Sequence, residues 1–205
     1  MTSLLISPST RRLTHTTTLP FSSNTTFSAL ADLSTYHNAS SLIHTSTITA
    51  HDSQSKIPQQ ATFNIGYPPL GVTEEWQCSV KCDRKAGTIE IKREGSSAIL
   101  QKNVMRWKVS SAGAGRTLLR LDLELKFKSA VVDCMFSMME SWVAETVVER
   151  FSELVKVKGE MENKDKRQRA GSRAVAASRS PPPAKKCVSK RVGIASAAGK
   201  QKATV

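Results

Sequence analysis

The sequence predicts an α+β protein in which a curved antiparallel sheet wraps around a long C-terminal helix. Residues 119–128 alternate strictly between apolar and polar side chains. This pattern is typical of an antiparallel strand with one face in water. Residues 130–157, which follow directly, contain no proline or glycine, and their apolar side chains recur at spacings of three and four. Such an amphipathic helix must cover its apolar stripe, and the apolar face of the sheet is the natural partner.

The remaining elements follow from shorter patterns. Strands are expected at residues 11–19, 44–52, 61–67, 75–83, 87–95, 103–111 and 117–129. A helix should follow Pro20, with Ser23 or Asn24 as its N-cap. The glycine-rich run 111–116 lies between two strands, so it predicts a hairpin turn and not a phosphate-binding loop.

The long helix has a candidate cap at Ser129, and Asp133 lies in its first turn, where a negative charge suits the helix dipole. At 1.5 Å per residue it would span about 40 Å. Its apolar stripe comprises Met135, Met138, Met139, Trp142, Val143, Val147, Phe151, Leu154 and Val155. We expect the face formed by Met135, Met139, Trp142 and Val143 to pack into the sheet, since it is too apolar to remain in water. Trp142 should therefore be buried.

Charge divides the 205-residue chain unevenly. Residues 159–205 carry 12 Lys/Arg and 3 Asp/Glu, whereas residues 1–158 carry 18 and 14. Few large apolar residues occur after 158, so we expect residues 159–205 to form a disordered basic tail. A folded domain is expected at 11–158, preceded by a polar leader at 1–10. Such a tail is either a solvated segment without a specific partner or a binder of nucleic acid or anionic lipid.

The N-terminus has the composition of a mitochondrial targeting peptide. Residues 1–31 contain 14 Ser/Thr together with Arg11 and Arg12, and no acidic residue precedes Asp32. The alternative is a polar leader to the first strand. No apolar run approaches the ~20 residues that a membrane-spanning helix needs.

An apolar loop separates two of the expected strands. Tyr67, Pro68, Pro69 and Leu70 occupy a position where polar turn residues are the norm. The prolines restrict the backbone. The loop is interpreted either as the rim of a ligand cavity or as a plug that closes the end of the core.

Neither a catalytic nor a metal site is predicted. The four cysteines lack the spacing of a disulfide framework or a paired metal motif, and Cys78 and Cys82 would be small buried hydrophobes on one strand face. The four histidines all lie within the first quarter of the chain, without a nucleophile–histidine–acid pattern. Surface or pairing roles are expected for His44 and His51.

Four stretches, in order, resemble the coenzyme Q-binding START-domain family of mitochondria, within the START-like or polyketide cyclase superfamily. They are residues 29–52, 61–80, 102–109 and 123–155, the third with a conspicuous Trp107. The resemblance covers about residues 11–157 and implies the helix-grip fold. The chain departs from the family at residues 39–43, which lack the family's bulky aromatic and proline. That departure puts the shape of one side of the pocket in question.

The resemblance implies a non-enzymatic protein that binds ubiquinone or a polyprenylated precursor, with no required cofactor, at the matrix side of the mitochondrial inner membrane. It implies as partners the quinone lipid, the membrane surface, and proteins of quinone synthesis or the respiratory chain, with no specific nucleic acid. The candidate cavity and rim residues are Phe63, Ile65, Tyr67, Pro68, Pro69, Leu70, Trp76, Met105, Trp107, Met139 and Val143. Two alternatives stay open: a START-like cyclase or hydrolase acting on an aromatic or polyketide substrate, and a nucleic-acid-binding protein acting through its tail.

Overall fold

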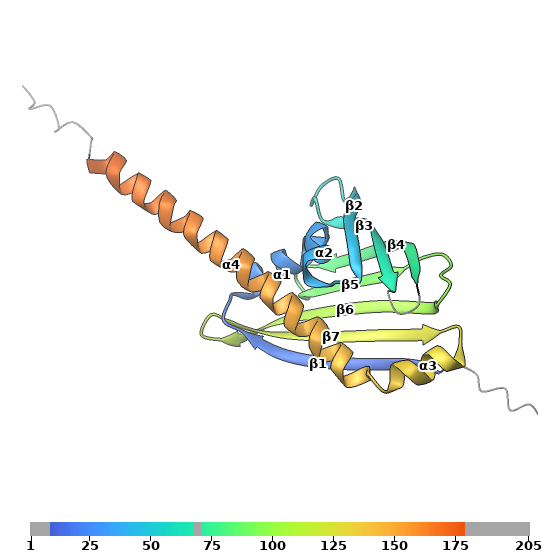
Figure 1. Ribbon diagram of the computed structural model, residues 1–205. Helices are drawn as coiled ribbons and strands as arrows, with labels where there is room; N and C mark the ends of the chain where they lie inside the picture. The colour runs from blue at the N-terminus through green and yellow to red at the C-terminus, as the bar shows by residue number, and fades with distance from the viewer. Residues whose placement is uncertain (1–8, 68–70, 179–205) are drawn as a thin grey trace, which may run out of the picture. The chain divides into compact units, whose positions relative to one another are not determined.

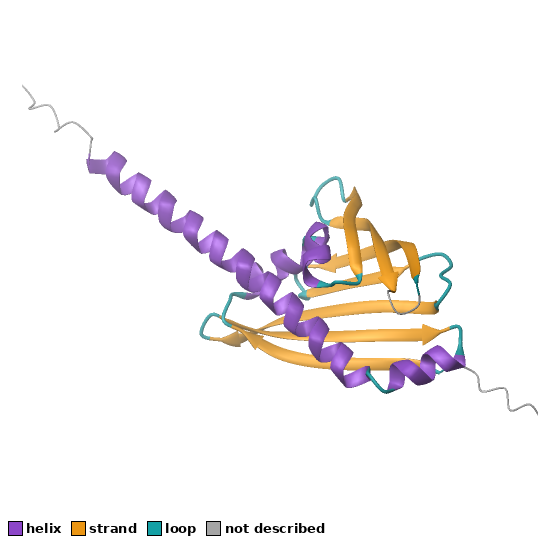
Figure 2. Cartoon of the chain, viewed as in Figure 1, coloured by secondary structure: helices purple, strands orange, loops and turns teal. Residues whose placement is uncertain are grey.

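The computed structural model describes residues 9–67 and 71–178, and the chain divides into two units, residues 1–166 and 167–205. The first unit contains a curved seven-stranded antiparallel sheet in the order β1-β7-β6-β5-β4-β3-β2 (Figure 1). The strands are β1 (Thr10–Leu19), β2 (Ile43–His51), β3 (Pro58–Tyr67), β4 (Val72–Asp83), β5 (Thr88–Arg93), β6 (Leu100–Gly113) and β7 (Arg116–Phe127). The helices are α1 (Ser23–Ala31), the 3-10 turn η1 (Leu33–Thr35), α2 (Tyr36–Ala39), α3 (Ala130–Ser137) and α4 (Glu140–Ser178), shown by element type in Figure 2. The predicted fold class is confirmed.

The inner face of the sheet forms the core. Leu119 and Leu121 in β7 are fully buried, and every second residue up to Phe127 is buried with them, as the alternation predicts. The turn between β6 and β7 requires positive φ angles at Gly113 and Gly115 and forces Ala114 into the same region, which confirms the predicted hairpin. Here a strictly patterned strand and a glycine turn fix the register of β6 and β7.

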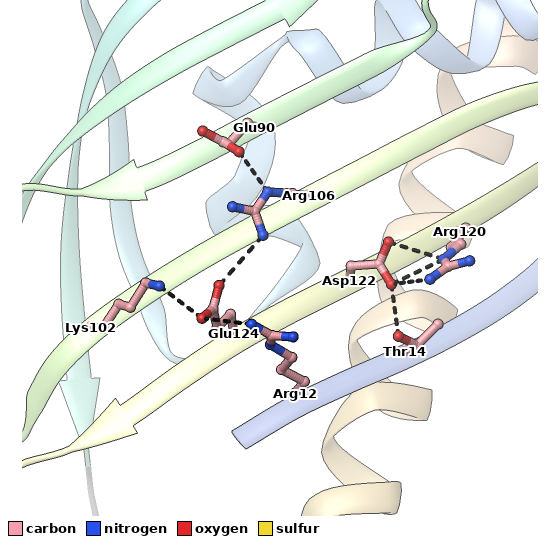
Figure 3. A network of polar contacts seen from close by, with 8 residues as sticks. All are labelled: Arg12, Thr14, Glu90, Lys102, Arg106, Arg120, Asp122 and Glu124. Carbon is pink, nitrogen blue, oxygen red and sulfur yellow. Dashed lines mark hydrogen bonds and ion pairs between the residues drawn. The ribbon is translucent and has the colours of Figure 1, made fainter. Parts of the chain in front are cut away.

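The outer face of the sheet carries an ion-pair network over β1, β5, β6 and β7 (Figure 3). Glu124 accepts a hydrogen bond from Lys102 Nζ at 2.7 Å and lies 3.5 Å from Arg106 and 3.8 Å from Arg12. The hydrogen bond from Lys102 and the surrounding cations lower the pKa of Glu124. The sequence places Glu124 on the wet face, yet it is only 8% exposed, because the long side chains of its partners cover it.

The first helix, α1, starts one residue earlier than expected. Ser22, and not Ser23 or Asn24, is the N-cap of α1, where its hydroxyl accepts a hydrogen bond from the Thr25 backbone N–H at 3.2 Å. The chain then turns through η1 into α2, which packs against β2. This places the fully buried Tyr36 beneath the sheet.

The C-terminal helical region differs from the prediction in two ways. It is broken at Met138 and Met139 into α3 and α4, and Trp142 is 64% exposed. The predicted burial of the Met135, Met139 and Trp142 face is therefore wrong, and Val143 is only half-buried. The helix packs on the sheet through the later part of the predicted stripe, Phe151, Leu154 and Val155, together with Ala144 and Val148.

The phase of the helix explains this error. At 3.6 residues per turn, Ala144 lies about 200° around the axis from Trp142. Once Ala144 begins the buried seam, Trp142 must face away from the sheet. Arg11 on β1 fixes the start of both helices, since its guanidinium pairs with Asp133 in α3 and, at 3.2 Å, with Glu140 in α4.

The ordered part of the chain also extends beyond the predicted end of the domain at residue 158. Helix α4 continues to Ser178, so the prediction that residues 159–178 are disordered is wrong. Gly159 lies inside the helix, where a Cβ atom would come within 2.5 Å of the Phe21 ring. This glycine therefore permits a close contact and does not begin a tail. Residues 1–8, which belong to the predicted leader, and residues 179–205 lie outside the described residues.

Candidate ligand cavity

A half-open cavity of about 50 Å³ lies on the inner face of the sheet. Its wall is mostly apolar and draws on α2 and on strands β2 to β6. The lining residues are Tyr36, Ile43, Phe63, Ile65, Trp76, Cys78, Ile91, Arg93, Asn103 and Met105. The strand register brings them together: Phe63 pairs with Trp76 between β3 and β4, and Ile91 pairs with Met105 between β5 and β6. Alternate residues of four neighbouring strands thus face one space.

An aromatic cluster supports the base of the cavity. The Tyr36 ring packs edge-on against Phe151 of α4, with centroids 4.5 Å apart, and lies 6.0 Å from Phe63. Trp107 lies 5.0 Å from Phe151 and is fully buried. The Tyr36 hydroxyl donates to the Leu30 carbonyl at 2.7 Å, which satisfies the polar atom. These contacts join helix, sheet and cavity wall into one packed unit.

Two titratable groups in the wall stay uncharged at neutral pH. Burial raises the pKa of the Cys78 thiol to about 12 and raises the pKa of Tyr36 well above its ordinary value of 10. A protonated thiol is a poor nucleophile and behaves as a small apolar group. These residues suit a cavity for an apolar ligand.

The cavity has one polar side, formed by Arg93 and Asn103. Arg93 is 7% exposed, and its terminal nitrogens donate to the carbonyls of Gly95 at 2.7 Å and of Leu100 at 2.9 Å. The guanidinium carbon lies 5.9 Å from the centroid of the Trp76 ring. Trp76 in turn donates from Nε1 to Glu74 at 2.9 Å. The positive charge of Arg93 therefore lies beside an otherwise apolar cavity wall.

The structure places some of the predicted site residues in the cavity wall and others elsewhere. Phe63, Ile65, Trp76 and Met105 line the cavity. Trp107 belongs to the core beside it, whereas the Met139 side chain is 47% exposed and, like Val143, does not line the cavity. Tyr67 ends β3 opposite Val72, and the remaining loop residues, Pro68, Pro69 and Leu70, lie outside the described residues.

Several lining residues were not predicted. Ile91 and Cys78 could have been found by extending the strand alternation from Met105 and Trp76. Ile43 belongs to the segment 39–43 that departs from the family pattern, so this segment does reach the cavity. Arg93 gave no usable signal, because a charged residue at a strand end ordinarily faces solvent.

Comparisons with known proteins concern the sequence and the fold as a whole. No family model matches the chain. The mitochondrial coenzyme Q-binding protein coq10 of Schizosaccharomyces pombe is 22% identical over 149 residues, which cover 73% of this chain and 89% of that protein. The resemblance found in the sequence is therefore confirmed by a curated relative.

Solved structures give the same fold. A START superfamily protein from Mycobacterium smegmatis matches with a TM-score of 0.61 at 19% identity, covering 71% of this chain and 97% of that one. The chain has the START-like fold. The Zhui aromatase/cyclase from Streptomyces sp. R1128 also shares the START-like fold, with a TM-score of 0.55 at 19% identity over 76% of this chain and 96% of that one. Within the described residues, no helix combines the length and apolar character needed to cross a membrane.

Proposed function

We propose that this START-like protein binds an isoprenoid quinone, ubiquinone or a polyprenylated precursor, and carries it without chemical conversion. The observation that carries the proposal is the similarity to coq10, which extends over 73% of this chain and 89% of that protein. In this proposal the quinone ring enters the cavity between β3 and β6. Burial of the ring and of the first isoprene units stabilises the complex by about 25 cal/mol per Å² of apolar surface.

The cavity must enlarge to accept a ring. A volume of about 50 Å³ is well below that of typical ligand pockets, which hold roughly 300–1,000 Å³. Met105 is the most adaptable of the lining side chains, since it is unbranched and polarizable. The ligand would therefore bind a more open state of the same wall, in which Met105 and Trp76 have moved apart.

The cellular setting of the proposal follows the name of the relative. That name gives the mitochondrion alone. We further propose that the protein acts at the matrix side of the inner membrane, where it would deliver the quinone to proteins of quinone synthesis or the respiratory chain. A fluorescent fusion that carries residues 1–40 should enter mitochondria, and a purely cytosolic signal would contradict this placement. No metal or cofactor is part of the proposed activity.

The decisive test identifies the bound lipid. Full-length protein purified from its native host is extracted with organic solvent, and the extract is analysed by mass spectrometry for isoprenoid quinones. Met105→Trp should fill the cavity and reduce the amount of quinone carried through purification several-fold. Met139→Trp is the matched control, because the same change on an exposed helix face should leave the lipid content unchanged. Wild-type protein without any quinone would refute the proposal.

A cyclase or hydrolase is the second candidate, because an aromatase/cyclase shares the START-like fold and the cavity has a polar side. A shared fold does not transfer a reaction. Turnover of an aromatic polyketide by the purified protein, lost in Arg93→Met, would favour this candidate over the carrier.

A further inference from the structure

Two polar atoms in the apolar cavity have no hydrogen-bond partner among the described residues. They are Arg93 Nε and Asn103 Oδ1, and both atoms are buried. Most buried polar atoms of folded proteins are paired, because an unpaired one has lost its water without a replacement. A donor and an acceptor that stay unpaired in the wall of one cavity indicate a partner that enters the cavity.

The strand register places the two side chains close to each other on the inner face. Ile91 pairs with Met105 and Lys92 pairs with Val104, so Arg93 and Asn103 are the next positions along β5 and β6. Both lie two residues from a cavity-lining residue of the same strand, and side chains two residues apart share a face.

The rest of the Arg93 guanidinium is held in place. Its two terminal nitrogens donate to the carbonyls of Gly95, Leu100 and Gln101, the last at 3.3 Å. None of the ion pairs found among the described residues involves Arg93. The bonds to the three carbonyls use three of the five guanidinium N–H groups, and Nε is the guanidinium nitrogen without a partner among the described residues. The permanent charge strengthens a hydrogen bond from Nε–H to a neutral oxygen.

We propose that Arg93 and Asn103 form a polar anchor for the ring oxygens of the ligand. Arg93 Nε–H donates to a quinone carbonyl, and Asn103 Oδ1 accepts from the hydroxyl of the reduced ring, the quinol. This assignment rests on the proposed quinone-binding function. It adds that the site selects its ligand, because the anchor distinguishes an oxygenated ring from an isoprenoid hydrocarbon. A site built to hydrogen-bond a ligand oxygen discriminates strongly against an analogue that lacks it, because its own buried groups are then left unpaired.

The test compares three probes on delipidated full-length protein, with binding measured as the amount of each lipid retained by the protein over a range of lipid concentrations, quantified by mass spectrometry. The probes are a short-chain ubiquinone, its quinol, and squalene, which has the isoprenoid chain but no oxygen. Arg93→Met should weaken ubiquinone binding about 10- to 100-fold, the effect of losing one charged hydrogen bond, and leave squalene binding unchanged. Arg120→Met, which changes an outer-face arginine, is the matched control.

Asn103→Leu keeps the proposal testable if Arg93→Met fails to fold, since Arg93 also holds three backbone carbonyls. This near-isosteric change removes the unpaired acceptor, so thermal stability of the ligand-free protein should hold or rise. It should weaken quinol binding more than quinone binding. If both folded variants bind ubiquinone and quinol within about twofold of wild type, the two groups pair only with water and the anchor is wrong.

The wild-type result separates the two levels of the proposal. Protein that binds squalene and ubiquinone equally well has an isoprenoid site without a ring anchor, which overturns the anchor and leaves lipid binding intact. Protein that binds neither ubiquinone nor quinol overturns the proposed function and the anchor together.

Discussion

The two halves of the C-terminal helical region look alike in sequence and lie in opposite environments. Residues 130–143 and residues 144–155 are both rich in apolar side chains at helical spacing. In the first half, Met135, Met138 and Trp142 are exposed. In the second half, Val148 and Phe151 are almost completely buried, the latter only 2% exposed. Apolar periodicity alone therefore does not decide burial.

The partner surface makes the difference. Phe151 packs against Tyr36 of α2 and Trp107 of β6, on the inner face of the sheet. The first half contains the break at Met138 and Met139, and it is tied to the sheet through the ion pairs of Arg11 and through Phe136, whose ring lies 4.9 Å from Phe127. A periodic stripe shows which residues share a face, whereas the extent of the opposing surface decides which of them are covered.

The largest effect is expected in the buried half. Phe151→Ala should lower the free energy of unfolding by about 3–5 kcal/mol, because it removes the ring that packs against both Tyr36 and Trp107. For a domain of this size the melting temperature should fall on the order of 10 °C. Urea unfolding followed by circular dichroism measures the change. A loss below about 1 kcal/mol would mean that the second half is not the packed half.

Much of the fold and part of the site were accessible from the sequence, and the misses have physical reasons. The alternation of β7 and the glycines at 113 and 115 determine their structure locally, and both predictions are confirmed. Phe63 and Trp76 were placed in the cavity wall because strand alternation reports which face a residue occupies. The burial of Arg93 depends on carbonyls at 95, 100 and 101, a loop geometry that no local pattern encodes.

A smaller, pH-dependent effect on stability is expected at the ion pair between Arg11 of β1 and Asp133 of α3. The hydrogen bond and charge of Arg11 keep the pKa of Asp133 below its ordinary value. A carboxylate with a lowered folded-state pKa stabilises the fold above its unfolded pKa, about 3.9, and this contribution is lost as the pH falls through the folded-state pKa. The melting temperature of wild type should therefore exceed that of Arg11→Met by a constant amount above about pH 5, and the difference should shrink below about pH 4.

Arg12→Met provides the matched control for this pH series. Arg12 is the neighbouring residue on β1, but its side chain is largely exposed and lies 3.8 Å from its partner Glu124. Its removal should cost less than that of Arg11 at every pH, since exposed ion pairs contribute little. Equal melting temperatures for wild type and Arg11→Met across the whole pH range would remove this ion pair as the tie between β1 and the helix start.

The smallest effect is expected at Trp142 in the first half, which the sequence predicts to be buried and the structure exposes. Trp142→Ala should change the free energy of unfolding by less than about 0.5 kcal/mol, because a side chain that is 64% exposed gives up little buried contact when it is truncated. The same substitution at the fully buried Trp107 is the control and should cost about 3–5 kcal/mol. Chemical denaturation of the two variants under identical conditions gives both values. A cost at Trp142 that approaches the cost at Trp107 would show that the first half of the helix is packed after all, and the contrast between the halves would then be lost.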